Sequence, residues 1–249
     1  MTIMTVFLKL LRTEMKISLR DPLYAFFTLL FPVLLIAILG NVPTMQEAPP
    51  ELGGLRVIDL YAGLALGLAI GIIGLQGLPA VLATYRERGI LRRLATTPVR
   101  PGLLLGAQLT MNLITVLISA VLVYTVANLA FDVPIPESPL LFLLAVLLNC
   151  SGAFAIGLLL AAVAPSGKTA NAIGTFLFFP LMFFAGLWAP RELMPEVLQR
   201  IGDFTPLAAG QDMMTDALLG HSPELISITV LLGYLVICGA AAVKFFRWE

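Results

Sequence analysis

The chain has 249 residues, of which 59% are hydrophobic and only 12% are charged, and its mean hydropathy is +0.97. A soluble domain carries about a quarter charged residues, so this composition excludes a disordered chain, a nucleic-acid-binding domain and an ordinary soluble enzyme. The formal net charge is zero, which favours neither an acidic nor a basic partner. We therefore expect one polytopic membrane domain, residues 1–249, with an all-α fold.

The N-terminal segment 2–20 is predicted to form an amphipathic helix. Four basic side chains share one stripe at helical spacing, and apolar side chains occupy the opposite side. Such a helix can lie in the membrane interface with its basic side toward the headgroups. Glu14 falls within the apolar arc, where a buried acid needs a cationic or hydrogen-bonding partner. In the alternative interpretation, the segment is a simple interfacial anchor and Glu14 reaches outward to water.

Six apolar stretches are predicted to cross the membrane, because a spanning helix needs about 20 mostly apolar residues. They run roughly over Pro22–Val42, Ile58–Ala83, Gly102–Ala130, Pro139–Ala164, Ala172–Trp188 and Leu225–Phe246. Prolines at 32, 79 and 180 predict local kinks in three of them. Glycines at 63, 67, 71, 74 and 77 predict a close packing face on the second span, either within the bundle or across a dimer.

The positive charges are unevenly distributed between the two sides of the membrane. Of the 15 Lys and Arg residues, 12 fall on the side of the N-terminus, and Arg56, Arg191 and Arg200 fall on the other. The positive-inside rule then places both termini in the cytoplasm, which agrees with an even number of spans. We expect a multi-pass membrane protein with both termini on the cytoplasmic side.

The segment 85–101, after the second span, reads YRERGILRRLATTPVRP. It holds five arginines, but Ile90, Leu91 and Leu94 make it too apolar for a plain solvated loop. A short helix here would place these three side chains on one side, with Glu87 among them, and most arginines on the other. Two interpretations remain open. The arginines either fix topology and touch anionic lipid, or they belong to a docking element for a cytoplasmic partner.

We expect no nucleotide, cofactor or metal site in this chain. Residues 162–169 read AVAPSGKT, which lacks the first glycine of a phosphate-binding loop and follows an apolar span instead of a strand. One histidine without clustered cysteines or carboxylates predicts no metal site. The spans also lack a paired acid and base or an activated serine, so nothing indicates an intramembrane enzyme.

No span carries a charged side chain near its centre, whereas ion-driven pumps usually need one. The polar side chains available in or near the spans are Gln76, Gln108, Asn112, Asn149 and Asn171, and we expect most of them to form interhelical hydrogen bonds. The fifth span is rich in phenylalanine. Its rings face lipid or the core, or some of them line a cavity for an apolar or planar substrate.

The long segment 189–224 before the last span mixes prolines with apolar residues at helical spacing. Its prolines at 190, 195, 206 and 223 divide it into short helices. Apolar side chains this close to a span predict re-entrant or interfacial helices on the outer side.

Two stretches together resemble the type-2 ABC exporter permease family. They are YRERGILRRLATTPVRP after the second span and FPLMFFAGLWAPRELMPEVLQRIGDFTPLAAG in and after the fifth. The resemblance covers essentially the whole chain. That family includes antibiotic-resistance permeases and is related to the G-subfamily drug and lipid exporters.

The resemblance implies one transmembrane half of an exporter that pairs with a second permease chain, identical or not, and docks two copies of a separate ATPase subunit. ATP and Mg would be held by that subunit, and no nucleic acid is implied. Segment 2–20 is similar to the family's connecting helix, and 85–101 to its coupling helix. The implied coupling residues are Glu87, Gly89, Arg92 and Arg93, with Glu14. By the same resemblance, faces of the second and fifth spans form the substrate cavity, with Tyr61, Gln76, Phe176, Phe179 and Phe183 as candidates.

The resemblance also implies the substrate, a hydrophobic or amphipathic drug, antibiotic or lipid leaving the cytoplasm or inner leaflet. Two alternatives stay open. One is a glycan or lipid-linked glycan exporter of the same superfamily, although the spans are very apolar for a wide polar channel. The other is a membrane scaffold or sensor subunit without a substrate path.

Overall fold

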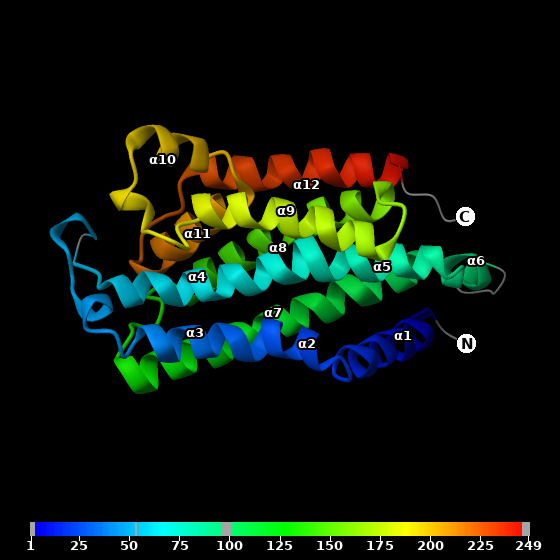
Figure 1. The fold of residues 1–249 in the computed structure, drawn as a ribbon, viewed down its shortest axis with the longest axis horizontal. Coiled ribbons are helices and arrows are strands. Elements are labelled where there is room, and N and C mark those ends of the chain that lie inside the picture. The colour runs from blue at the N-terminus through cyan, green and yellow to red at the C-terminus, as the bar shows by residue number, and fades with distance from the viewer. Residues whose placement is uncertain (1–2, 53, 96–100, 246–249) are drawn as a thin grey trace.

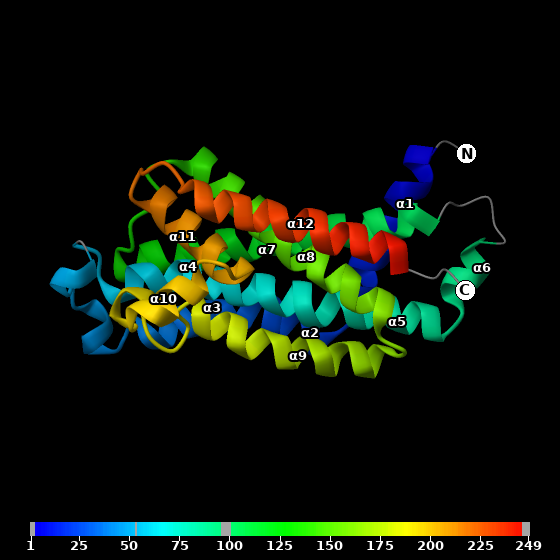
Figure 2. The same cartoon turned by 90° about the horizontal axis from the view of Figure 1, so that it is seen from above.

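The computed structural model describes residues 3–52, 54–95 and 101–245, and in these ranges the chain forms helices and connecting segments without a strand. The long helices pack side by side into one elongated bundle, as Figures 1 and 2 show. The expected all-α membrane fold is therefore confirmed.

Long helical elements run along the bundle, and shorter ones cover its ends. The long ones are α2 (Pro22–Ala25) continued by η1 (Phe26–Leu30) and α3 (Phe31–Leu39), α4 (Val57–Gly71) continued by η4 (Ile72–Gly77) and α5 (Leu78–Glu87), α7 (Pro101–Phe131), α8 (Pro139–Val163), α9 (Gly167–Phe184) and α12 (Leu225–Phe245). The shorter ones are α1 (Ile3–Ser18), η2 (Pro43–Gln46), η3 (Pro50–Leu52), α6 (Ile90–Ala95), η5 (Arg191–Leu193), α10 (Glu196–Gly202) and α11 (Pro206–Leu218). In Figure 1, α1, α6 and the last turn of α12 lie at one end, and α10 lies at the other.

Five helical stretches are long and apolar enough to cross a membrane. They are Pro22–Leu39, Val57–Glu87, Gly102–Phe131, Pro139–Val163 and Leu225–Phe245. The chain is thus a multi-pass membrane protein. The fifth predicted span corresponds to α9, which begins at Gly167 and not at Ala172. Because its first turns carry Lys168 and Asn171, α9 is less apolar than the other five, and its crossing stays a prediction.

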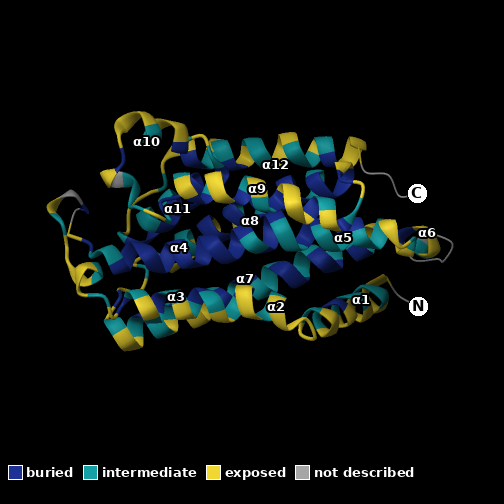
Figure 3. Cartoon of the chain, in the orientation of Figure 1, coloured by how far each residue is buried: buried dark blue, intermediate teal, exposed yellow. Residues whose placement is uncertain are grey.

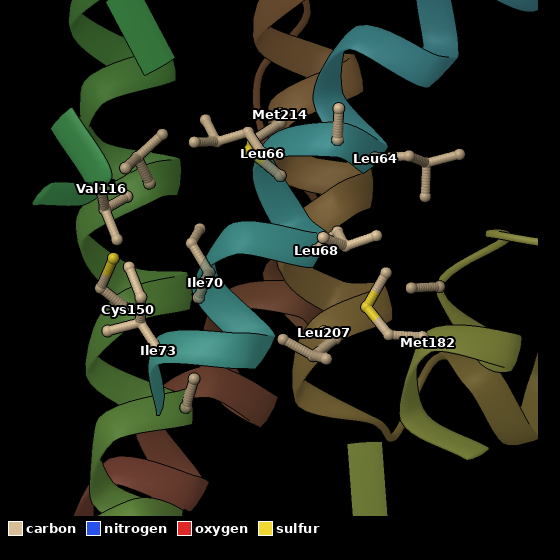
Figure 4. Close-up of a cluster of buried hydrophobic side chains, with 14 of the residues drawn as sticks. Leu64, Leu66, Leu68, Ile70, Ile73, Val116, Cys150, Met182, Leu207 and Met214 are labelled. Carbon is tan, nitrogen blue, oxygen red and sulfur yellow. The ribbon is translucent and has the colours of Figure 1, made fainter. Parts of the chain in front are cut away.

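The core of the bundle surrounds α4, which is buried along nearly its whole length (Figure 3). Figure 4 shows this core with Leu64, Leu66, Leu68, Ile70, Ile73, Val116, Cys150, Met182, Leu207 and Met214 labelled. These side chains come from α4 and η4 and from the neighbouring helices α7, α8, α9 and α11. Since lipid tails are as apolar as leucine, close van der Waals packing around α4 holds these helices together.

The two π-helical segments η1 and η4 each end two residues before a proline. Pro32 and Pro79 have no amide hydrogen, so neither can donate to the carbonyl four residues earlier. The hydrogen bonding there shifts by one residue, and Phe31 N–H and Leu78 N–H donate five residues back. In contrast, α9 runs through Pro180 as a continuous helix. Of the three prolines that predicted kinks, two therefore coincide with a change in helical hydrogen bonding.

Glycines let two helices approach the backbone of η4. A β-carbon at Gly157 of α8 would collide with the carbonyl oxygen of Gly74, and one at Gly174 of α9 would collide with that of Leu75. The Leu75 carbonyl is the one to which Pro79 cannot donate, so the α9 backbone covers it. A β-carbon at Gly74 would in turn lie 2.8 Å from that of Ala153 on α8, so the predicted glycine face of the second span packs within the bundle at this point.

Replacing Gly174 with alanine should therefore destabilise the chain by about 1–3 kcal/mol, as overpacking usually does. The obstacle is a backbone carbonyl, which cannot move aside as a flexible side chain can. The matched control is Gly233→Ala on α12, where an added β-carbon meets nothing within 4 Å. Unfolding in mixed micelles by denaturant titration measures both, and equal stability of the two variants would contradict the close approach.

The segment 189–224 forms short helices, as predicted, but these helices differ in burial. On α10, Val197 is 69% and Ile201 46% exposed, which suits a peripheral helix. Most of α11 is buried, and it packs against α4, α8 and α12. The second half of the segment thus belongs to the bundle core.

Candidate functional site

Glu14 attaches α1 to the rest of the bundle. It is 5% exposed, and its Oε2 accepts hydrogen bonds from the Tyr85 hydroxyl of α5 at 2.8 Å and from Nε2 of Gln108 on α7. Burial raises the pKa of the Glu14 carboxyl above its ordinary value, and the two hydrogen bonds offset only part of that effect. The buried acid has the hydrogen-bonding partners it was expected to need, and the outward-reaching alternative is wrong.

Arg86 joins α5 to the end of α8. Its guanidinium donates to the carbonyl oxygens of Ala161 and Ala162, each at 3.0 Å, and to that of Ala164. The last carbonyls of a helix lack intrahelical partners and carry the negative end of the helix dipole. The cationic fork of Arg86 therefore caps α8 from a neighbouring helix.

Glu87 joins the same helix to the start of α9. Its Oε2 accepts a hydrogen bond from the Gly167 backbone N–H at 3.2 Å. The Ser166 hydroxyl accepts one from the Thr169 N–H at 3.1 Å. Both oxygens face the positive end of the α9 dipole. In a phosphate-binding loop, the backbone amides at the start of the helix bind phosphate. In the segment 162–169, the amides of Gly167 and Thr169 instead donate to side chains of the protein itself.

A sharp turn at Gly89 separates α5 from α6. Gly89 has φ of +68°, in the left-handed region that glycine adopts without strain. On α6, Leu91 is fully buried, whereas Arg92 and Arg93 are exposed. The helix therefore presents two adjacent cations at the end of the bundle (Figure 1). Residues 96–100 of the predicted loop lie outside the described residues.

The sequence of the chain matches known transport proteins. The family model of the ABC-2 type transporter matches residues 5–219. The chain belongs to the ABC-2 type transporter family. It is 23% identical over 230 residues to the putative transport permease YvfS of Bacillus subtilis (strain 168), with 90% of each chain covered. It is 28% identical over 123 residues to the inner membrane transport permease YhhJ of Escherichia coli (strain K12), which covers 49% of this chain and 33% of that protein.

The protein is therefore a transmembrane subunit of an ABC transporter, and family membership implies association with an ABC ATPase subunit. The resemblance stated from the sequence is confirmed at this level. Both named relatives are described as permeases.

Of the five residues expected to line a substrate cavity in this ABC-2 subunit, two lie apart on the second span and three share one face of α9. Tyr61 is 6% exposed, and its hydroxyl donates to the carbonyl oxygen of Leu187 at 3.2 Å. Gln76 is half-buried in η4, about 22 Å further along the same helical rod. An exposed face of α9 carries the three rings Phe176, Phe179 and Phe183. The assignment of these five residues to a cavity stays a prediction.

Sequence reasoning did not single out Tyr85 and Arg86, although both connect α5 to other helices at this end of the bundle. Gln108 was expected to form an interhelical hydrogen bond, and it does so with Glu14. Asn112 does so as well, because its Oδ1 accepts from the Tyr24 hydroxyl at 2.7 Å. Gln108 and Asn112 are four residues apart and therefore share one face of α7. This spacing was the signal in the sequence for a polar contact between α7 and its neighbours.

Proposed function

We propose that the chain is the transmembrane subunit of an ATP-driven exporter and that α6 is the element on which its ATPase acts. The observation that carries this proposal is the connection of α6. Through the Gly89 turn it continues into α5, whose Arg86 and Glu87 are bonded to the ends of α8 and α9. A displacement of α6 would therefore move three long helices at once.

The proposed transport cycle follows from these connections. Two copies of a separate subunit bind and hydrolyse ATP, holding the nucleotide and Mg themselves, and push on α6 of two permease chains. Rigid helices pass the displacement to the cavity between the chains, which narrows inside and opens outside. The substrate leaves because the two states bind it with different affinity.

The proposed orientation places both termini in the cytoplasm of a bacterial cell, with α1 and α6 at the inner face. The exposed cations Lys9, Arg12 and Lys16 of α1 lie at the same end of the bundle as Arg92 and Arg93. This clustering supports the orientation, because positive side chains favour the cytoplasmic side.

The proposed substrate is a hydrophobic or amphipathic small molecule. Support comes from the exposed aromatic face of α9, where Phe179 and Phe183 lie beside Trp188 with ring centroids 6.3 and 6.4 Å apart. Such a face can pair with a second permease chain and enclose an apolar substrate between the two.

The experiment combines Arg92→Ala with Arg93→Ala and, separately, tests Glu87→Ala. We expect both folded variants to stay in the membrane while substrate-stimulated ATPase activity and efflux fall about tenfold. The double arginine variant loses a docking contact, and Glu87→Ala loses the hydrogen bond that connects α5 to α9. The readouts are ATPase activity of the complex purified with the tagged chain, with and without substrate, and transport into inverted vesicles.

The matched control combines Lys168→Ala with Lys244→Ala, which removes two exposed cations from the same end of the bundle but from α9 and α12. We expect this control to behave as the unmodified chain. Full stimulation of the ATPase in the Arg92 and Arg93 variant would reject α6 as the docking element. An ATPase that copurifies but does not respond to any substrate would favour the scaffold or sensor alternative.

A further inference from the structure

A cavity of about 230 Å³ lies between α1, α2, α5 and α7, near the end of the bundle that carries α6. These elements lie close together in Figure 1. Polar side chains in its lining could bind a ligand, and they include Glu14, Asp21, Tyr24, Tyr85, Gln108 and Asn112. Much of the remaining lining is apolar, including Leu78, Val81 and Met111. The cavity therefore combines a polar side with an apolar one.

The polar side of the cavity is buried. Glu14 is 5% exposed, and Gln108 and Asn112 are each 2% exposed. Removing such groups from water is costly unless they are hydrogen-bonded. Among the residues that the structure describes, both hydrogen bonds to Glu14 end on Oε2, which leaves the acceptor capacity of Oε1 for another donor.

Asn112 also has unused hydrogen-bonding capacity. Its Oδ1 accepts from Tyr24, but its buried Nδ2 has no hydrogen-bond partner among the described residues. Leaving a buried amide donor of this kind without a partner destabilises the fold. Nδ2 itself has no accessible surface, so the hydrogen-bonding capacity that the cavity offers to an occupant is that of Glu14 Oε1.

The charges around the cavity are of one sign. Its lining includes two acids, Glu14 and Asp21, and none of its lining residues is Lys, Arg or His. Asp21 is exposed and already accepts from the backbone N–H groups of Leu23 and Tyr24, each at 3.1 Å. Glu14 is thus the acid available inside, and its raised pKa reflects burial that a bound cation would compensate.

We propose that this cavity binds the head of an amphiphile that carries a protonated primary amine. The ammonium group donates to Glu14 Oε1. The first methylene groups lie against Leu78 and Val81, and the tail leaves past Ile17, which is 52% exposed at the rim. The resemblance also implies a coupling role for Glu14, but this site is formed by α1, α2, α5 and α7 and not by α6, and its test does not involve the ATPase.

The test uses the full chain in phosphatidylcholine nanodiscs, with dodecylamine and dodecanol as matched probes. We expect saturating dodecylamine to raise the Tm by about 5 °C and dodecanol to raise it much less. Glu14→Gln keeps the size of the side chain and should abolish the difference between the two probes. The control Glu196→Gln, an exposed acid on α10, should retain it.

A second variant, Val81→Phe, fills the cavity while keeping Glu14 and should also abolish the amine effect. The source of the natural amine is distinguished by nanodiscs that contain phosphatidylethanolamine. A Glu14-dependent rise in Tm in those discs identifies a lipid headgroup, and its absence with dodecylamine binding retained identifies a soluble amphiphile. Equal responses of the unmodified chain and Glu14→Gln to dodecylamine, or equal effects of amine and alcohol, would overturn the proposal.

Discussion

Replacing Arg86 with alanine should destabilise the folded chain by about 3 kcal/mol or more. Three backbone carbonyls at the end of α8 would lose their donor, and hydrogen bonds that involve a charged group contribute about 1.5–3 kcal/mol each. Water replaces part of this loss because Arg86 is only half-buried. We expect a lower Tm in detergent and less folded protein in the membrane.

Two further variants separate capping from simple loss of charge. Arg88→Ala removes a neighbouring exposed cation from the same turn and should change the stability by less than about 0.5 kcal/mol. Arg86→Lys keeps the charge but replaces the planar fork by a single ammonium, so it should recover part of the stability. If Arg86→Ala were as stable as Arg88→Ala, α8 would not depend on this cap.

The spans could be predicted because a membrane permits so few backbone solutions. Every buried backbone group in lipid must be paired internally, so a long apolar run is a helix. Hydropathy alone, however, placed the start of α9 five residues too late. Hydropathy rises only after Lys168 and Asn171, whereas the helix begins at Gly167, directly after its N-cap Ser166. A capping serine and a preceding proline were the signals for the true start.

The contacts at the α6 end could be anticipated only in part. The buried position of Glu14 follows from helical periodicity, because it lies in the apolar arc of α1. Its partners Tyr85 and Gln108 are 71 and 94 residues away in the sequence, and periodicity within one helix says nothing about such pairs. Arginine spacing likewise predicts a basic side for the segment 85–101 but not that Arg86 turns to backbone carbonyls of α8.

At the opposite end of the bundle, Arg191 connects α10 with α11. Its side chain is 10% exposed. Nη2 donates to Oδ1 of Asp203 at 2.6 Å and to the carbonyl oxygen of Gln199 at 3.1 Å, and Nη1 donates to the carboxylate of Asp212. Burial opposes the charged guanidinium, but the charge of Asp212 and the hydrogen bonds to both aspartates outweigh it, so the pKa of Arg191 is raised.

Arg191→Ala should therefore destabilise the chain by about 2–4 kcal/mol. This loss is somewhat smaller than that expected on breaking a fully buried ion pair, because the two aspartates are 35–36% exposed. The two carboxylates would then lie near each other without the cation between them. The matched control is Arg200→Ala, whose ion pair with Glu196 is exposed on both sides and should contribute no more than about 1 kcal/mol. Thermal unfolding and limited proteolysis of residues 189–224 measure both variants. An Arg191→Ala chain as stable and as resistant as Arg200→Ala would mean that the packing of α11 alone holds this segment in place.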